Sequence, residues 1–301
     1  MKYITKYLIL LSTISFFTSC QVELNIGCIS PEGTIETRTF EFNDFDKVVF
    51  ELDAEVVIRQ GETQEVVIES NANILDRIED DSQINGDELV LAINGCSKLD
   101  REDVKISITM KAIESIIISG DAVVDSEGTW TDLGDLDLSI EGDGTMNIDF
   151  NEVNEMVIQV DGDGEFNLTG IADELKVDLS GDAILNTEGL NARKAAIKIE
   201  GDADCELTVS EEIDIDVKGD GTLEIWGTAD EQKIDVSGDA SIRNFELISQ
   251  TTKIRIQGDA NCEVTVEESL TVEIRGDGSI CYRGQPSLEV DVGSGSISDC
   301  N

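Results

Sequence analysis

The stretch KIDVSGDASI, residues 233–242, alternates apolar and polar residues as a β-strand does, yet Gly-Asp-Ala interrupts it in the middle. The same interruption occurs nine times, at intervals of 18 to 22 residues. The turn glycines are Gly120, Gly142, Gly162, Gly181, Gly201, Gly219, Gly238, Gly258 and Gly276, followed by the variant GSGS from Gly293. A repeat of about 20 residues is typical of one coil of a solenoid.

Aligning the nine copies on the glycine shows which positions point inward. The residues four and two positions before it are Ile, Leu or Val in every copy, and the residue four positions after it is always apolar. In the quoted copy these are Ile234, Val236 and Ile242, with polar Ser237 and Asp239 between them. Apolar and polar residues therefore alternate with a period of two across the glycine, which indicates strands and excludes a helix.

The glycine and the residue two positions beyond it share the inward-facing parity of the apolar rows. The second of these is Ala or Gly in every copy, as at Gly221 and Ala240. We therefore expect a tight bend where one sheet passes into the next, close to another wall of the protein. Glycine would there adopt a backbone conformation that is costly for other residues.

Copies of this kind bury their apolar rows only by stacking, in parallel and about 4.8 Å apart. The sequence thus predicts an all-β fold, in which residues 116–301 form a parallel β-helix with coils of about 19–20 residues. Each coil would be completed by a variable return loop such as TADEQ, residues 228–232. Residues 40–115 are strand-rich without the strict spacing, and we expect them to form a cap or irregular opening coils. Within them we predict a short helix at ANILDRI, residues 72–78, and a hairpin at INGDELVLAI, residues 84–93.

The first twenty residues, MKYITKYLILLSTISFFTSC, carry lysines, a short apolar run and small residues before a cysteine. The apolar run is too short to cross a bilayer, so it indicates a secretory signal. We interpret Cys20 as a lipidation site that becomes the new N-terminus, with residues 21–39 as a tether. The alternative is an ordinary signal peptide cut near Ser19. The residue after the lipidated cysteine is Gln21 and not Asp, which by analogy with lipoprotein sorting favours the outer membrane over the inner. Which face of that membrane the protein occupies stays open.

Composition excludes several functional classes. The 301 residues contain no histidine, which excludes imidazole-based catalysis such as a Ser-His-Asp triad and most zinc enzymes. The formal net charge is −44, with 65 acidic against 21 basic residues. A surface this acidic repels nucleic acid, so we expect no nucleic-acid partner.

Six cysteines remain once Cys20 carries lipid, and an exported protein can pair them. Cys205 and Cys262 share one inward column three coils apart, too far for a disulfide, and are expected to be small core residues. Cys28 with Cys96 and Cys281 with Cys300 remain as candidate disulfides. Free thiols are the alternative for each pair.

One aspartate follows each turn glycine, and stacking would align these residues in an outward ladder. The ladder consists of Asp121, Asp143, Asp163, Asp182, Asp202, Asp220, Asp239, Asp259 and Asp277. Adjacent charges about 4.8 Å apart repel by about 1 kcal/mol in water, which bound Ca²⁺ would relieve. The alternative, which we favour, is that each carboxylate accepts hydrogen bonds from its own turn and is otherwise solvated, because one carboxylate per coil is far short of the six to eight oxygens that Ca²⁺ takes.

The chain resembles the bacterial auto-transporter adhesins with a head GIN domain. The resemblance rests on FDKVVFELDAEVVIRQGETQEVVIES (residues 45–70), NGDELVLAI, VKISITMKAIESIIISGDA (residues 104–122) and the glycine-centred turns through VGSGSIS, and it covers roughly residues 40–298. It implies a right-handed parallel β-helix, similar to pectin lyases but without their catalytic residues, on an exported and lipid-anchored protein. For function it implies cell adhesion, with a homo-oligomer such as a trimer as the assembly.

We therefore expect a non-enzymatic lipoprotein of the cell envelope, outer-membrane or cell-surface, that presents a rigid acidic β-helix for adhesion or scaffolding. Its expected partners are the membrane, through the N-terminal lipid, and a glycan or protein ligand at the surface. The alternative function is a carbohydrate-binding or polysaccharide-cleaving protein of the pectin-lyase type. We expect no cofactor, with calcium on the aspartate ladder as the competing hypothesis.

Overall fold

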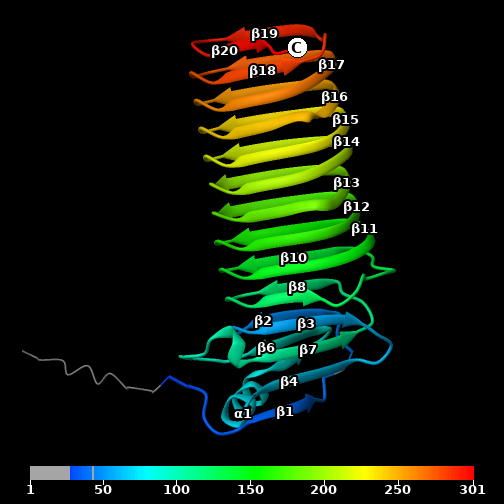
Figure 1. The fold of residues 1–301 in the computed structure, drawn as a ribbon, viewed down its shortest axis with the longest axis vertical. Coiled ribbons are helices and arrows are strands. Elements are labelled where there is room, and N and C mark those ends of the chain that lie inside the picture. Colours follow the sequence, from blue (N-terminus) through cyan, green and yellow to red (C-terminus); the bar gives the residue numbers. More distant parts are fainter. Residues whose placement is uncertain (1–27, 43) are drawn as a thin grey trace, which may run out of the picture.

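The computed structural model describes residues 28–42 and 44–301, and these form a parallel β-solenoid whose coils stack into a column (Figure 1). The one α-helix of the described residues, α1, spans Ala72–Asp81, and a short 3₁₀ helix spans Arg101–Asp103. The opening strands are β1 (Ile35–Phe40), β2 (Lys47–Glu51), β3 (Glu55–Gln60), β4 (Glu65–Asn71), β5 (Gln83–Asn85), β6 (Glu88–Ala92), β7 (Lys105–Met110), β8 (Ser115–Ile118) and β9 (Val123–Ser126). The remaining strands are β10 (Leu136–Glu141), β11 (Thr145–Asp161), β12 (Glu165–Gly181), β13 (Ile184–Gly201), β14 (Asp204–Lys218), β15 (Thr222–Ser237), β16 (Ser241–Gln257), β17 (Asn261–Ile274), β18 (Ser279–Arg283), β19 (Ser287–Val292) and β20 (Ser296–Asp299).

Each coil has two faces that meet at the Gly-Asp turn. We call the half-strands that follow a turn the first face and those that precede the next turn the second face. From β11 to β17 a single continuous strand supplies both faces of a coil. Neighbouring coils pair in parallel and in the predicted register, as Ile215, Ile234 and Ile254 show. The parallel β-solenoid predicted from the sequence is therefore confirmed.

The predicted return loops differ in one respect, because the chain stays in strand conformation around that edge. Residues 228–232, expected to be a loop, lie inside β15. The pairing there shifts register, for example between Val209 and Glu212 of β14. Such bulges absorb the variable coil length while the backbone N–H and C=O groups remain paired to the neighbouring coils.

The interior is filled by the apolar rows that the repeat defines. Every residue of the three predicted rows is buried, among them Ile234, Val236 and Ile242, at most 3% exposed. Each coil thus stacks aliphatic side chains on those of the next coil. At about 25 cal/mol per Å² of apolar surface removed from water, this continuous core is the main stabilising contribution.

The turn glycines lie close to the neighbouring coil, and this corrects the expectation that they pass close to another wall. Gly238 has a φ of +145°, and a Cβ added to it would lie 2.2 Å from the carbonyl oxygen of Gly219, the turn glycine of the preceding coil. The small residue two positions further on does face another wall. A Cβ on Gly164 would lie 2.7 Å from the Ile140 side chain, inside the solenoid.

The opening coils do not stack in sequence order. β2 lies between β6 and β8, and β3 lies between β7 and β9, in both cases in parallel. Residues 47–60 therefore form a coil inserted between residues 88–110 and residues 115–126, as the positions of β2 and β3 below β8 in Figure 1 show. The chain passes on to the end of the column, forms the cap and returns beneath its own earlier coil.

The N-terminal end of the column is closed by antiparallel strands and α1. β4 pairs antiparallel with β7, and β1 with β4. Helix α1, which covers the predicted helix, buries Ile74, Leu75 and Ile78 completely. The segment expected to be a tether over residues 21–39 therefore ends earlier, because β1 belongs to the cap.

The predicted hairpin at Asn85-Gly86 is present, with β5 and β6 antiparallel and Gly86 at a φ of +72°. At the opposite end, β19 and β20 make up the final coil in Figure 1. None of the helices formed by the described residues has both the length and the hydrophobicity needed to cross a membrane.

Candidate functional site

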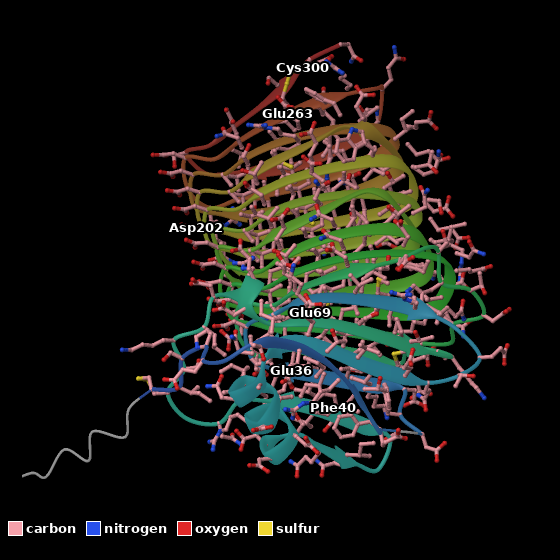
Figure 2. All side chains as sticks on the ribbon, turned by 60° about the horizontal axis from the view of Figure 1, so that its bottom comes forward. Glu36, Phe40, Glu69, Asp202, Glu263 and Cys300 are labelled. Carbon is pink, nitrogen blue, oxygen red and sulfur yellow. A yellow bond between two sulfur atoms is a disulfide. The ribbon has the colours of Figure 1, made fainter. Side chains whose placement is uncertain are left out.

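The predicted aspartates line the turn edge of the solenoid, and all nine are exposed. Figure 2 shows Asp202 on this edge. We call this row, together with Asp53, the aspartate ridge. Asp53 was not predicted as a member, yet its carboxylate accepts a hydrogen bond from the backbone N–H of Asp121, 3.2 Å away. The sequence does carry a signal for this membership: Asp53-Ala54 is followed by the alternating apolar residues Val56 and Ile58, as in the Gly-Asp-Ala repeats. Leu52 stands where those repeats have the turn glycine.

Besides Asp53, three ridge carboxylates accept hydrogen bonds along the column. Asp220 accepts a hydrogen bond from the backbone N–H of Asp239, at 3.3 Å. Asp239 accepts one from Asp259, and Asp259 one from Asp277, at 3.3 and 3.2 Å. The favoured alternative, in which each carboxylate is bound by its own turn, is therefore wrong for these residues. Their backbone N–H donors come from the next coil, which accounts for a carboxylate at this position without a bound cation.

The metal hypothesis has one further candidate within residues 28–42 and 44–301. Asp46, Asp87 and Glu114 bring three carboxylate oxygens within 4.8 Å of one another. The Lys47 ammonium already lies among them, 2.7 Å from Asp87 and 3.6 Å from Glu114. Its hydrogen bond lowers the pKa of Asp87, while burial and the neighbouring carboxylates raise the pKa of Asp46. We interpret this group as an ion pair built around a lysine.

The second face carries an ion-pair ladder that runs across the coils. Lys233 contacts Asp214 and Asp235, and Arg255 contacts Asp235 and Glu273, with N···O distances of 2.9 to 3.5 Å. These contacts raise the pKa of Lys233, chiefly through the hydrogen bond to Asp214. Exposed pairs contribute only about 0–1 kcal/mol each, so the ladder balances charge locally more than it stabilises the fold.

The first face differs, because its centre carries stacked carboxamides. Asn147, Asn167 and Asn186 occupy the same position, five residues after their turn glycines, in three consecutive coils. Asn167 Nδ2 donates to Asn147 Oδ1 at 2.8 Å, and Asn147 Nδ2 donates to Asp125 Oδ1 at 2.6 Å. Sequence reasoning missed this asparagine ladder, although aligning the copies on the glycine places the three residues in one column.

The cysteines divide into two bonded pairs and two buried thiols. The structure joins Cys28 to Cys96 and Cys281 to Cys300, with Cα–Cα distances of 4.6 and 5.8 Å. Cys205 and Cys262 are free and buried, and burial raises the pKa of the Cys205 thiol to about 12. Such thiols are unreactive core residues. The predicted lipidation site, Cys20, lies outside the described residues.

One of the solved structures similar to this chain has a TM-score above 0.5 and shares its fold. A crystal structure described as a putative lipid binding protein from Parabacteroides distasonis has a TM-score of 0.51 and 18% identity, covering 91% of this chain and 100% of its own. A second, described as a putative adhesin from the same species, has a TM-score of 0.49 and 17% identity, covering 89% and 98%. No curated protein matches the sequence.

The family comparison covers most of the chain. Residues 44–229 and 219–286 match the family model described as "Putative auto-transporter adhesin, head GIN domain". The matched residues include the cap apart from β1, the inserted coil and the repeats that carry the aspartate ridge and the asparagine ladder. The chain therefore belongs to the family of auto-transporter adhesins with a head GIN domain.

Proposed function

We propose that this protein is a lipid-anchored, non-enzymatic adhesin of the outer membrane, which holds a rigid acidic solenoid at the cell surface and binds its ligand through a face of that solenoid. The observation that carries the proposal is the architecture itself, within the adhesin family to which the chain belongs. Stacked coils hold side chains in fixed arrays over a long surface, which suits multivalent binding.

Three further features support an extracellular location. The two disulfides are typical of proteins in oxidising compartments. The charge of −44 favours solubility, which suits a solenoid held out from the membrane by its tether. The sequence ending at Cys20 provides an export signal and a residue for lipid attachment.

Lipid attachment and surface exposure can be tested on growing cells. Labelled palmitate is expected to enter the wild-type chain but not a Cys20→Ala variant. Because stacked strands resist proteolysis, a tobacco etch virus protease site inserted between Glu23 and Leu24 gives a cleaner test of exposure. Addition of that protease to intact cells is expected to release the solenoid into the medium. Retention by intact cells, with release only after lysis, would contradict the surface location.

Adhesion is tested by comparing cells that carry the wild-type chain with cells that lack it. Wild-type cells are expected to attach more strongly to glycan-coated and protein-coated surfaces. The Cys20→Ala variant is the matched control, because it has the same solenoid without the proposed anchor. Equal attachment by all three strains would refute the adhesin proposal.

A further inference from the structure

The asparagine ladder leaves hydrogen-bonding groups unused on the first face. Asn167 donates to Asn147 and also to Glu165 Oε1 at 3.0 Å, while its own Oδ1 accepts no bond from the described residues. The Asn186 carboxamide and the Thr169 hydroxyl likewise make no side-chain hydrogen bond within residues 28–42 and 44–301. A carboxamide offers two donors and one acceptor oxygen in one plane, and a hydroxyl offers both. Paired and unpaired polar groups thus lie side by side.

These groups line a shallow groove of about 410 Å³ on the first face. Its polar lining includes the three ladder asparagines with Asp125, Asp149 and Thr169. Asp149, Thr169 and Asn186 are exposed, whereas Asn147 and Asn167 are half-buried. The hydrogen bond from Asn147 to Asp125 and that from Asn167 to Asn147 fix the orientation of these two amides before any ligand arrives, which lowers the entropic cost of binding.

The groove is unsuited to three classes of ligand. No lysine or arginine is among its lining residues, while Asp125 and Asp149 are, so a polyanion would be repelled. Protein interfaces centre on aromatic, methionine or arginine anchors, and none of these lines the groove. Added strands are also excluded, because the backbone groups of β11, β12 and β13 are already paired coil to coil.

We propose that the asparagine ladder and its groove bind a neutral polysaccharide, through hydrogen bonds between the sugar hydroxyls and the free groups of the amides and Thr169, with Asn167 Oδ1 as an acceptor. The inference rests on the proposed function in that the glycan is the ligand by which the adhesin attaches. The stacking of identical amides in parallel coils repeats the binding groups along the column at about 4.8 Å per coil. A chain with repeated hydroxyls matches a binding surface with repeated donors and acceptors.

The test uses the anchored protein purified in detergent and passed over immobilised mannan, xylan, dextran, galactan and β-glucan, with polygalacturonate as the anionic probe. The variants are Asn167→Val and the double variant Asn167→Val/Asn186→Val, because valine suits a strand position and has no hydrogen-bonding group in its side chain. Gln257→Val is the matched control, since it removes an exposed carboxamide from a strand on the second face. Circular dichroism shows whether each variant keeps the fold.

The wild-type protein is expected to bind at least one neutral polysaccharide, equally well in 0.5 M NaCl, and to leave polygalacturonate unbound. The double variant is expected to bind about tenfold or more weakly, since two net hydrogen bonds are lost, and Gln257→Val is expected to bind as wild type. Binding to none of the neutral polysaccharides, or binding that the double variant retains in full, would overturn the inference. Cells that attach normally while carrying the double variant would overturn this site and leave the adhesin proposal standing.

Discussion

The contact between turn glycines makes a sharp prediction for Gly238→Ala. Gly238 has a φ of +145°, and its added Cβ would meet the Gly219 carbonyl oxygen at 2.2 Å. The alanine must therefore change its backbone conformation or push two coils apart. Either response breaks the pairing at a turn on which the neighbouring coils depend.

The expected loss can be estimated from these two effects. Holding a residue with a Cβ in a glycine-only region costs about 1–3 kcal/mol. Relieving an overlap with backbone atoms costs about 1–3 kcal/mol more, as in overpacked cores. We therefore expect Gly238→Ala to lower the free energy of unfolding by about 2–6 kcal/mol, a large part of the 5–15 kcal/mol typical of a folded protein.

The measurement is urea unfolding followed by circular dichroism, with amide hydrogen exchange to localise the damage to the coils around β15 and β16. Gly134→Ala is the matched control, because its Cβ would meet no atom within 4 Å and its φ is not positive. We expect that variant to be unchanged or stabilised by up to about 1 kcal/mol. Equal unfolding midpoints for the two variants would refute the packing argument.

Four further outcomes are expected. Asn244→Leu should stabilise the chain by about 1–3 kcal/mol in urea unfolding, because Asn244 is 0% exposed and its amide has no partner among the described residues; a loss would contradict this. Asp46→Asn should stabilise at pH 7 and have no effect below about pH 4, because the raised pKa of Asp46 makes the wild type lose stability as pH rises through that pKa; a gain of equal size at both pH values would count against it. Cys28→Ser/Cys96→Ser should cost about 4 kcal/mol, since the bond closes a 68-residue separation, and an unchanged midpoint would be the contrary result. Millimolar Ca²⁺ and EDTA should give the same melting temperature, because the ridge carboxylates accept backbone N–H groups, and a marked rise with Ca²⁺ would restore the metal hypothesis.

The repeat could be predicted because its information is local. Each copy carries its own alternation and its own turn glycine, so aligning copies such as those around Gly219 and Gly238 was enough to define the coil, the register and the buried rows. The opening coils are different, because β2 and β3 are separated from their partners by the whole cap. No spacing in the sequence indicates that residues 47–60 lie between two later segments. Asp53 also could not be recognised as a member of the aspartate ridge, because Leu52 stands where the repeat has its glycine.

The candidate surface was predictable in part. The aspartate ridge followed from the repeat, but the source of its donors did not, because a hydrogen bond from Asp239 to Asp220 depends on the offset between two coils. The asparagine ladder was present in the alignment as a column of three identical residues. Its binding capacity became visible only once the structure gave the direction of each amide bond and the groove around it.

Because of the inserted coil, the two ends of the column resist a pulling force in different ways. A pull applied through the N-terminal segment reaches Cys28, which is bonded to Cys96 beside the cap. Residues 47–60 cannot peel away like a terminal coil, because β2 and β3 must slide against β6, β7, β8 and β9 at once. The final strands β19 and β20 are each paired to one earlier strand, and the Cys281–Cys300 disulfide holds this end closed. If the proposed N-terminal lipid anchors the chain, the inserted coil lies at the end through which the cell would pull on the column.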